Sequence, residues 1–394
     1  MRLSRRITSI VPGAEDGWEV YYRARDMIAA GEPVVMLTIG DHDIATDRRI
    51  LAAMQESVAS GHTGYTPVEG IGPLREAVAA RAARRAAQPA RAEEVAIVPG
   101  GQAGLFASLM TALDPGESCV ILDPYYATYA QTVRAAGGRP IEVPCQAGDG
   151  FQPDARAIEA ALAPDTRAIL INTPNNPTGA VYSRAALEAL AALCRARDLW
   201  LISDEVYESQ VWQGEHVSPR ALRGMAERTL VVNSLSKSHG MTGFRMGWVL
   251  GPEEAVARIC DLAIATTYGL PGFIQDAAAW ALADEAAEAG LRARYAARRE
   301  AALAALADAP GLRVSPPQGG MYLMLDIRAT GLSGAAFADR LLEAERIAVM
   351  PGESFGAAAA GHVRVALTRP EEVLVPALRR LARLVEELSV GATA

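Results

Sequence analysis

Residues 168–179 read AILINTPNNPTG, residues 199–207 read LWLISDEVY, and residues 229–237 read TLVVNSLSK. Each stretch is a short apolar run that ends in polar residues. Continuous apolar runs of this length are typical of strands that are buried on both faces of a parallel sheet. Ligands of such sheets bind beyond the carboxyl ends of the strands. The three polar segments are therefore predicted to meet in one crevice.

The sequence around these stretches alternates strand and helix patterns. From about residue 94 to 285, Ala-rich helical stretches such as Gln102–Leu113, Ser183–Arg197 and Glu253–Ala265 separate the apolar runs. This alternation predicts an α/β fold with a mostly parallel, seven-stranded sheet. The predicted strands are Val95–Val98, Cys119–Leu122, Pro140–Val143, Ala168–Asn172, Leu199–Ser203, Thr229–Asn233 and Gly247–Leu250.

The C-terminal third of the chain has a different pattern. One long Ala/Arg/Glu stretch predicts a single helix from Ala281 to Ala307. Beyond it we predict strands and helices at Met321–Leu325, Ala335–Glu345, His362–Leu367 and Glu371–Leu388. The chain is therefore expected to form a large domain, residues 45–285, and a smaller α+β domain, residues 1–44 and 286–394.

Composition and charge exclude several classes of protein. The 394 residues are half apolar and one fifth charged, as in globular proteins. The net charge of −8 argues against a general nucleic-acid or membrane binder, because both need a basic face. The four cysteines form no metal or disulfide motif, and no apolar run reaches the ~18 residues of a membrane span. We expect a cytoplasmic protein that binds small molecules and no metal.

The use of lysine is unusual. Lysine and arginine together number 38, and only Lys237 is a lysine. Arginine keeps its proton, so it serves poorly as a nucleophile or proton carrier, whereas a lysine amine can do both. Lys237 is therefore a candidate for amine chemistry, with a biased genome composition as the alternative explanation.

A glycine-rich turn precedes a predicted helix at residues 99–104, PGGQAG. Free N–H groups at a helix N-terminus favour the binding of a phosphate group. The amides of Gly101, Gln102 and Ala103 would face that phosphate. A dinucleotide site is the alternative, but the spacing is not G-x-G-x-x-G and such a site would leave Lys237 without a role.

One cofactor needs an amine, a carboxylate, a phenol, an amide and a phosphate site together, and this is pyridoxal phosphate. Its aldehyde forms an imine with a lysine, for which Lys237 is the candidate. Asp204 would keep the ring nitrogen protonated, and Tyr207 and Asn176 would donate hydrogen bonds to the phenolic oxygen.

Two further residues are expected at the phosphate. Ser234 follows the third apolar run, and Arg245 lies eight residues after Lys237. A guanidinium can grip a phosphate with two hydrogen bonds, so Arg245 is the predicted cation of this site.

Taken together, these motifs resemble the class I/II, fold-type I aminotransferases over nearly the whole chain. The motifs that carry the resemblance are Tyr65–Arg75 (YTPVEGIGPLR), Asn175–Gly179 (NNPTG), Ser203–Tyr207 (SDEVY), Ser234–Lys237 with Arg245, and Gly361–Ala366 (GHVRVA). The resemblance implies an enzyme that transfers the amino group of an L-amino acid to pyruvate or 2-oxoglutarate by a ping-pong mechanism, with Lys237 as acid and base.

The resemblance also assigns residues that spacing alone does not. It implies that Asn176 touches the cofactor phenolate, that Tyr126 stacks on the cofactor ring and that Arg364 binds the substrate carboxylate beside Gly40. It further implies that Tyr65 reaches the phosphate in a partner subunit, which makes a homodimer the expected assembly.

Other functions share this apparatus. A lyase, a decarboxylase or a cyclopropane-forming synthase that uses pyridoxal phosphate is the alternative on the same fold. A pyridoxal-phosphate-sensing regulator is disfavoured, because about 40 residues before the α/β unit leave no room for a DNA-binding domain.

One loop departs from the family pattern. Relatives usually show Gly-Asp/Glu-Pro-Asp-Phe-x-Thr-Pro, whereas residues 40–47 here read GDHDIATD. Because this loop lies near the substrate in relatives, the substrate preference is left open. His42 is the main novelty, and an exposed histidine without a role is the alternative interpretation.

Three segments resemble arginine–pyruvate aminotransferase-like members in particular. They are Gly214–Pro219 (GEHVSP), Phe273–Ala278 (FIQDAA) and Gly331–Leu342 (GLSGAAFADRLL). A cationic substrate would need a carboxylate in the pocket, and the candidates are Glu15, Asp16, Asp41 and Asp43.

Overall fold

The large sheet has seven strands in the order β2-β8-β7-β6-β5-β3-β4. The computed structural model describes residues 1–11, 17–86 and 88–391. Strand β8 is antiparallel to both of its neighbours and every other pair is parallel, so the predicted mostly parallel, seven-stranded sheet is confirmed. The strands are β2 Val95–Val98, β3 Ser118–Asp123, β4 Arg139–Pro144, β5 Thr166–Asn172, β6 Trp200–Asp204, β7 Thr229–Ser234 and β8 Gly247–Leu250.

Helices cover both faces of this sheet. In β3, Cys119 and Ile121 belong to one buried cluster, while Val120 and Leu122 belong to the cluster on the other face. This alternation buries every residue of the strand, which explains its continuous apolar run. The helices of this body are α3 Arg48–Ala59, α4 Gly72–Ala86, α5 Gly101–Ala112, α6 Tyr129–Ala135, α7 Ala155–Ala161, α8 Arg184–Arg197, α9 Leu235–Ser238, α10 Glu253–Ala265 and α11 Gly272–Ala283.

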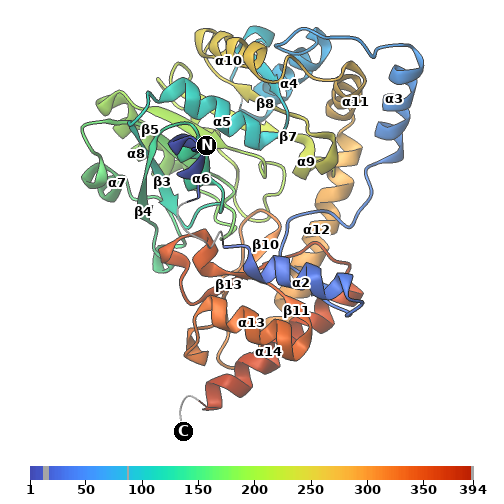
Figure 1. The fold of residues 1–394 in the computed structure, drawn as a ribbon, viewed down its shortest axis with the longest axis vertical. Helices are drawn as coiled ribbons and strands as arrows, with labels where there is room; N and C mark the ends of the chain where they lie inside the picture. The colour runs from blue at the N-terminus through green and yellow to red at the C-terminus, as the bar shows by residue number, and fades with distance from the viewer. Residues whose placement is uncertain (12–16, 87, 392–394) are drawn as a thin grey trace.

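A smaller body lies below the large sheet in Figure 1, where α13 and α14 cover strands β10 and β13. Its four-stranded antiparallel sheet has the order β12-β13-β10-β9, and the pair β1-β11 is parallel. The strands are β1 Val35–Met36, β9 Arg313–Val314, β10 Tyr322–Asp326, β11 Ile347–Ala348, β12 Met350–Pro351 and β13 His362–Ala366. The helices are α12 Glu285–Leu306, α13 Gly334–Glu345 and α14 Glu371–Gly391.

The single helix predicted from Ala281 to Ala307 is wrong. The structure has two helices, α11 and α12, which are separated at Asp284. The Asp284 backbone is extended, and its carboxylate accepts a hydrogen bond from the Ala286 N–H at 2.9 Å. Asp284 is therefore the N-cap of α12, a role that favours aspartate and that breaks a helix which composition alone would continue.

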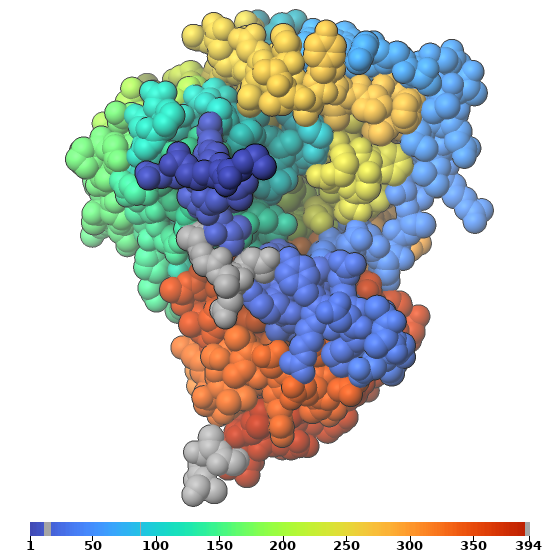
Figure 2. All heavy atoms as spheres, viewed as in Figure 1, coloured from blue at the N-terminus to red at the C-terminus, as the bar shows by residue number. Residues whose placement is uncertain are grey.

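The N-terminal segment crosses both bodies. In the space-filling view of Figure 2, its first residues lie on the surface of the large body, where Arg6 donates to the carbonyl of Ala136 (3.3 Å). Helices α1 (Arg5–Thr8) and α2 (Glu19–Ala29) belong to it, and Arg23 of α2 forms ion pairs with Asp339 and Glu343 of α13. The domain boundaries at residues 44/45 and 285/286 stay a prediction.

Two more expectations concern the whole chain. Glu15 and Asp16, two of the carboxylates considered for a cationic substrate, lie outside the described residues. Among the residues that the structure describes, no helix is both long enough and apolar enough to cross a bilayer. The cytoplasmic location stays a prediction.

Candidate active site

The carboxyl ends of β5, β6 and β7 meet at one cavity, as the sequence predicts. The last residues of β5 and β6, Asn172 and Asp204, are register partners, and Asp204 also pairs with Val232 of β7. The cavity has a volume of about 520 Å³. All but two of the predicted site residues line it, namely Gly40, Gly101, Gln102, Tyr126, Asn176, Asp204, Tyr207, Ser234, Lys237, Arg245 and Arg364.

Lys237 lies on the single turn of α9, directly after β7. Ser234 caps this turn, and its hydroxyl accepts a hydrogen bond from the Ser236 N–H (3.0 Å). The Nζ of Lys237 donates to the carbonyl oxygen of Gly40 at 2.5 Å. A Cβ atom at position 40 would lie 2.0 Å from the Tyr322 hydroxyl oxygen, so the close approach requires glycine. The amine is thus held in the cavity by a neutral carbonyl that a ligand can replace.

Asp204 is buried at the base of the cavity. One carboxylate oxygen accepts from the Tyr129 hydroxyl (2.6 Å) and the other from the Val206 N–H (3.2 Å). Burial raises the pKa of Asp204 to about 6, and the hydrogen bond from Tyr129 opposes this rise. A buried carboxylate of this kind favours a protonated, positively charged partner, such as the nitrogen of a pyridine ring.

Two tyrosines predicted at the site have tyrosine neighbours. The hydroxyl oxygens of Tyr207 and Tyr322 lie 3.1 Å apart, and burial raises the pKa of Tyr207 well above its ordinary value. The ring of Tyr126 lies edge-on to that of Tyr129, with 5.8 Å between the ring centroids. Both Tyr207 and Tyr126 remain neutral near pH 7 and offer hydroxyl donors to the cavity.

The far end of the cavity suits an anion. Gly100 has a φ of +84° and is the N-cap of α5, so the first N–H groups of that helix have no side-chain cap. A Cβ atom on Gly100 would lie 2.3 Å from the Arg245 Nη2 atom. The guanidinium of Arg245 donates only to the carbonyls of Thr242 (2.8 Å) and Pro99 (3.4 Å) in the described part of the chain. Helix amides and a guanidinium without a carboxylate partner are the donors that a phosphate group needs.

Arg364 is 1% exposed and has no carboxylate partner among the described residues. Its Nη1 donates to the Asn176 side-chain oxygen (2.8 Å) and its Nη2 to the Thr38 carbonyl, while its Nε has no hydrogen-bond partner within the described ranges. The guanidinium lies between the rings of Tyr322 and Phe355, 4.2 and 4.4 Å from their centroids. Burial lowers the pKa of Arg364, and the neighbouring tyrosines oppose this shift.

Asn176 connects the Asp204 region of the site with Arg364. Its backbone N–H donates to the side-chain oxygen of Asn172 (2.7 Å), and the Asn172 amide donates to the Asp204 carbonyl (3.0 Å). Because its own side-chain oxygen accepts from Arg364, its Nδ2 group is left to donate to a ligand.

The structure places two predicted residues outside the cavity lining. Ala103 packs against the apolar cluster under α5, so only its backbone could serve a ligand. Tyr65 is 89% exposed, and its ring contacts that of Tyr268, which is 58% exposed. Neither residue contributes a side chain to the cavity of this subunit.

Sequence reasoning missed several residues of the cavity. Tyr129, Tyr322 and Asn172 line it, and Phe355 completes the cage around Arg364. Tyr129 lies only three residues after Tyr126, and this closeness in the sequence is the signal that could have indicated it. Tyr322 and Phe355 lie on segments far from Tyr126 in the sequence, so no local pattern indicates that they line the site.

The acidic candidates in the divergent loop differ in availability. Asp43 forms a bidentate ion pair with Arg298 at 2.8 Å for both contacts, so it is not free for a substrate. Asp41 lines the cavity and accepts one hydrogen bond, from the Thr242 hydroxyl (2.9 Å).

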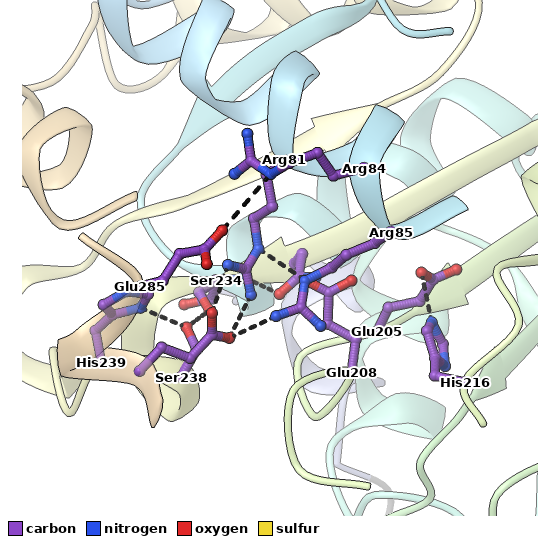
Figure 3. Close-up of polar contacts among 12 residues, drawn as sticks. Arg81, Arg84, Arg85, Glu205, Glu208, His216, Ser234, Ser238, His239 and Glu285 are labelled. Atoms are coloured by element: carbon purple, nitrogen blue, oxygen red, sulfur yellow. Dashed lines mark hydrogen bonds and ion pairs between the residues drawn. The ribbon is translucent and has the colours of Figure 1, made fainter. Parts of the chain in front are cut away.

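An ion network lies beside the Lys237 segment (Figure 3). Arg81 binds Glu208 (2.9 Å) and Glu288 (2.6 Å), and Arg85 binds Glu288 at 2.9 Å. Together with Glu205 and His216, Glu208 brings three possible metal ligands within 4.8 Å of one another. Arginines already neutralise Glu208, so the network supports the segment after Asp204 and offers little to a cation.

Glu205 also has hydrogen-bond partners, which are two serines and a histidine rather than arginines. It accepts hydrogen bonds from Ser203 (2.9 Å), Ser218 (2.8 Å) and His216 (3.0 Å). These contacts tie the segment after β6 to residues 216–218, so Glu205 has a structural role.

Known proteins share this architecture along their full length. The sequence matches the family described as aminotransferase class I and II over residues 32–381. An arginine–pyruvate transaminase of Pseudomonas aeruginosa is 44% identical, with 98% of this chain and 99% of the relative covered. An aspartate/prephenate aminotransferase of Thermus thermophilus is 38% identical, with 97% and 98% covered.

Solved structures agree. An aspartate aminotransferase of Thermus thermophilus in complex with maleate has a TM-score of 0.91 at 38% identity, covering 98% of this chain and all of that one. One from Thermotoga maritima has a TM-score of 0.92 at 31% identity, with 98% and 100% covered. Members of this family generally depend on pyridoxal phosphate. The fold, the cavity and these similarities together show that the chain belongs to the class I and II aminotransferases, fold-type I enzymes that transfer amino groups between amino acids and 2-oxo acids.

Proposed function

We propose that this cavity holds pyridoxal phosphate on Lys237 and that the enzyme transfers the amino group of an L-amino acid to a small 2-oxo acid. The bound cofactor supplies an electron sink for the bond between the substrate Cα and its hydrogen. Asp204 would face the ring nitrogen and keep its proton, while Tyr207 and the Asn176 amide would donate to the phenolic oxygen.

The phosphate would lie at the other end of the cavity. The amides at the start of α5, including those of Gly101 and Gln102, would donate to it together with Arg245 and the Ser234 hydroxyl. Tyr126 also lines the cavity, where its ring would cover one face of the cofactor. These residues bind and orient but move no proton.

Lys237 has the central chemical role in this proposal. Its amine lies at the Gly40 carbonyl, which is part of the cavity lining that also includes Arg364. With a substrate bound, the Lys237 amine would be placed to take the proton from the substrate Cα and to give it back, so it would act as both base and acid.

Arg364 is the observation that carries the proposal. An unpaired guanidinium in a buried site is costly, and the cost is recovered when an anion binds. The α-carboxylate shared by amino acids and 2-oxo acids is planar and matches the two-pronged geometry of arginine. Its neighbours Tyr322 and Phe355 fix the plane of the guanidinium, so the substrate carboxylate would be oriented as well as neutralised.

The charges of the cavity also bear on the substrate. Lys237, Arg245 and Arg364 are the cations among the described lining residues, and each already has a proposed partner. A second carboxylate on the substrate would meet no further cation among these described lining residues and would face Asp41. We therefore propose pyruvate rather than 2-oxoglutarate as the acceptor, and a donor with an uncharged or cationic side chain. Arginine, named for the Pseudomonas relative, is the first donor to test.

The test is to follow each half-reaction of the purified holoenzyme by its absorbance with a panel of amino acids, and to identify the products by mass spectrometry. Formation of the 2-oxo acid from the donor and of alanine from pyruvate supports the proposal. Release of ammonia or carbon dioxide in step with donor consumption would instead identify a lyase or a decarboxylase. Borohydride reduction should fix a pyridoxyl group on Lys237.

We also propose that a second copy of the chain covers the surface around Tyr65. Tyr65 and Tyr268 are large, adjacent and exposed, which is unusual for a surface that faces only water. A homodimer in which Tyr65 reaches the partner's phosphate site would bury both rings. A monomer with full activity, found by light scattering during turnover, would contradict this assembly.

A further inference from the structure

The divergent loop contacts the segment of Lys237 at three points. The Gly40 carbonyl accepts from the Lys237 amine, and the Thr46 hydroxyl donates to the carbonyl of Gly240 at 2.7 Å. Between them, the Nε2 atom of His42 lies 2.9 Å from the carbonyl oxygen of Ser236, the residue before Lys237. His42 is thus not an exposed loop residue, which was the alternative interpretation.

The partners of His42 define its protonation state. A carbonyl oxygen only accepts, so His42 Nε2 must carry a hydrogen and donate it to Ser236. The Nδ1 atom lies 2.8 Å from the Tyr295 hydroxyl, which can donate to it. Both ring nitrogens are therefore satisfied by one neutral tautomer.

The surroundings favour that neutral form. Burial and then the charge of Lys237 lower the pKa of His42 to about 4, against weaker opposing contributions from Ser236, Asp41 and Asp43. Asp43 is itself neutralised by Arg298, so it attracts a proton to the imidazole only weakly. Burial, the largest cause, therefore keeps the imidazole neutral near pH 7.

The partner of His42 is rigid. Tyr295 belongs to α12 and is fully buried, and the Arg298 guanidinium lies over its ring at 5.5 Å from the centroid. Arg298 also donates to the Leu367 carbonyl at 3.1 Å. A chain of fixed contacts therefore leads from α12 through Tyr295 and His42 to the Ser236 carbonyl.

Lys237 needs such support because α9 is a single turn. A helix of four residues has little stability of its own, so the direction of its side chains depends on outside contacts. The carbonyl of Lys237 accepts from Gln210 Nε2 at 3.1 Å, and that of Ser236 accepts from His42. These two hydrogen bonds fix the peptide groups on both sides of the Lys237 Cα.

We propose that His42 is a positioning residue. Its neutral imidazole bridges the Tyr295 hydroxyl and the Ser236 carbonyl, and this bridge fixes the direction of the Lys237 amine. The inference rests on the proposed role of Lys237 as the cofactor-binding and proton-transferring amine. It applies to this chain in particular, because the loop carries histidine where the family pattern has proline.

The experiment compares three holoenzyme variants with the wild type. His42→Leu removes both hydrogen bonds, and His42→Gln retains an amide that can donate to Ser236. Thr46→Val is the matched control, because it removes one hydrogen bond from the same loop to the same segment but three residues beyond Lys237. Each protein is assayed for kcat, for KM of the amino donor, and for the rate at which its apoprotein develops the colour of lysine-bound cofactor.

A small displacement of the amine lowers kcat and the rate of colour formation, whereas Arg364 and the substrate contacts are unchanged. We expect His42→Leu to lose about tenfold in both rates with KM nearly constant, and His42→Gln to recover most of the loss. Thr46→Val should resemble the wild type.

Equal rates for His42→Leu and Thr46→Val would overturn the inference, as would a rise in KM alone. If His42→Leu fails to fold, Tyr295→Phe replaces it, because loss of the Tyr295 hydroxyl frees the imidazole to turn away from Ser236. A rate for Tyr295→Phe equal to that of the control would then overturn the inference. A wild type that develops no colour would refute the proposed function itself, so the two failures are distinguishable.

Discussion

Replacement of Asp204 by asparagine separates the cost of this carboxylate to the fold from its benefit to catalysis. The substitution keeps the size and shape of the side chain. The Val206 N–H can still donate to the amide oxygen, and the Tyr129 hydroxyl can turn to accept from the amide nitrogen. The fold should therefore survive, and the main change is the loss of a buried negative charge.

The magnitude follows from the pKa of Asp204 in the absence of cofactor. Burial raises it from 3.8 to about 6, so the folded apoprotein retains a proton that the unfolded chain releases between these pH values. Below pH 4 the carboxyl is protonated in both the folded and the unfolded chain, so burying it costs no charge. As the pH rises through 6 the buried carboxyl ionises, and the fold loses stability. Two pH units correspond to about 3 kcal/mol of unfolding free energy, a penalty that is complete by pH 8 and about half as large at pH 5.

The assay is urea unfolding of both apoproteins, followed by tryptophan fluorescence between pH 4 and pH 8. The asparagine variant has no charge to bury, so the difference between its unfolding free energy and that of the wild type should grow by about 2.5 kcal/mol from pH 4 to pH 8. The holoenzyme should show the opposite effect, a fall of several orders of magnitude in kcat, because the ring nitrogen loses its anionic partner. An identical pH dependence of unfolding for the two apoproteins would refute the reasoning, and so would a nearly unchanged kcat.

Lys237→Ala should abolish both the colour of the holoenzyme and its turnover, as measured by absorbance and by product formation; retention of either excludes the imine at this position. Arg364→Lys keeps the charge but loses the two-pronged grip, so kcat/KM for the amino donor should fall about 100-fold, whereas the exposed control Arg294→Lys should not change it. Gly100→Ala should weaken cofactor binding about tenfold in a fluorescence titration, because the new Cβ would lie 2.3 Å from Arg245. Gly116→Ala has a similar positive φ and open space around it, so it controls for backbone strain, and an equal loss of affinity would contradict a role for the glycine at the phosphate.

Much of the large sheet could be predicted, because the residues of each strand themselves form a recognisable pattern. The strand patterns at residues 95–98 and 247–250 match the observed strands residue for residue, since each run is buried on both faces and needs no knowledge of its neighbours. The break at Asp284 could not be predicted in the same way. Alanine, arginine and glutamate favour a helix on both sides of it, whereas the Asp284 backbone is extended and its side chain caps α12.

The sequence alone determined the chemical groups of the site, since the only lysine, the aspartate after an apolar run and the glycine turn each follow a strand whose end is recognisable. It also determined that these groups converge, because parallel strands share their carboxyl edge. The tertiary structure decided which groups are paired and which are not. Tyr129 is paired with Asp204, Asp43 with Arg298 and His42 with Tyr295, while the guanidinium of Arg364 has no carboxylate partner in the part of the chain that the structure describes. These outcomes depend on contacts between segments far apart in the chain, and no local pattern specifies the geometry of such contacts.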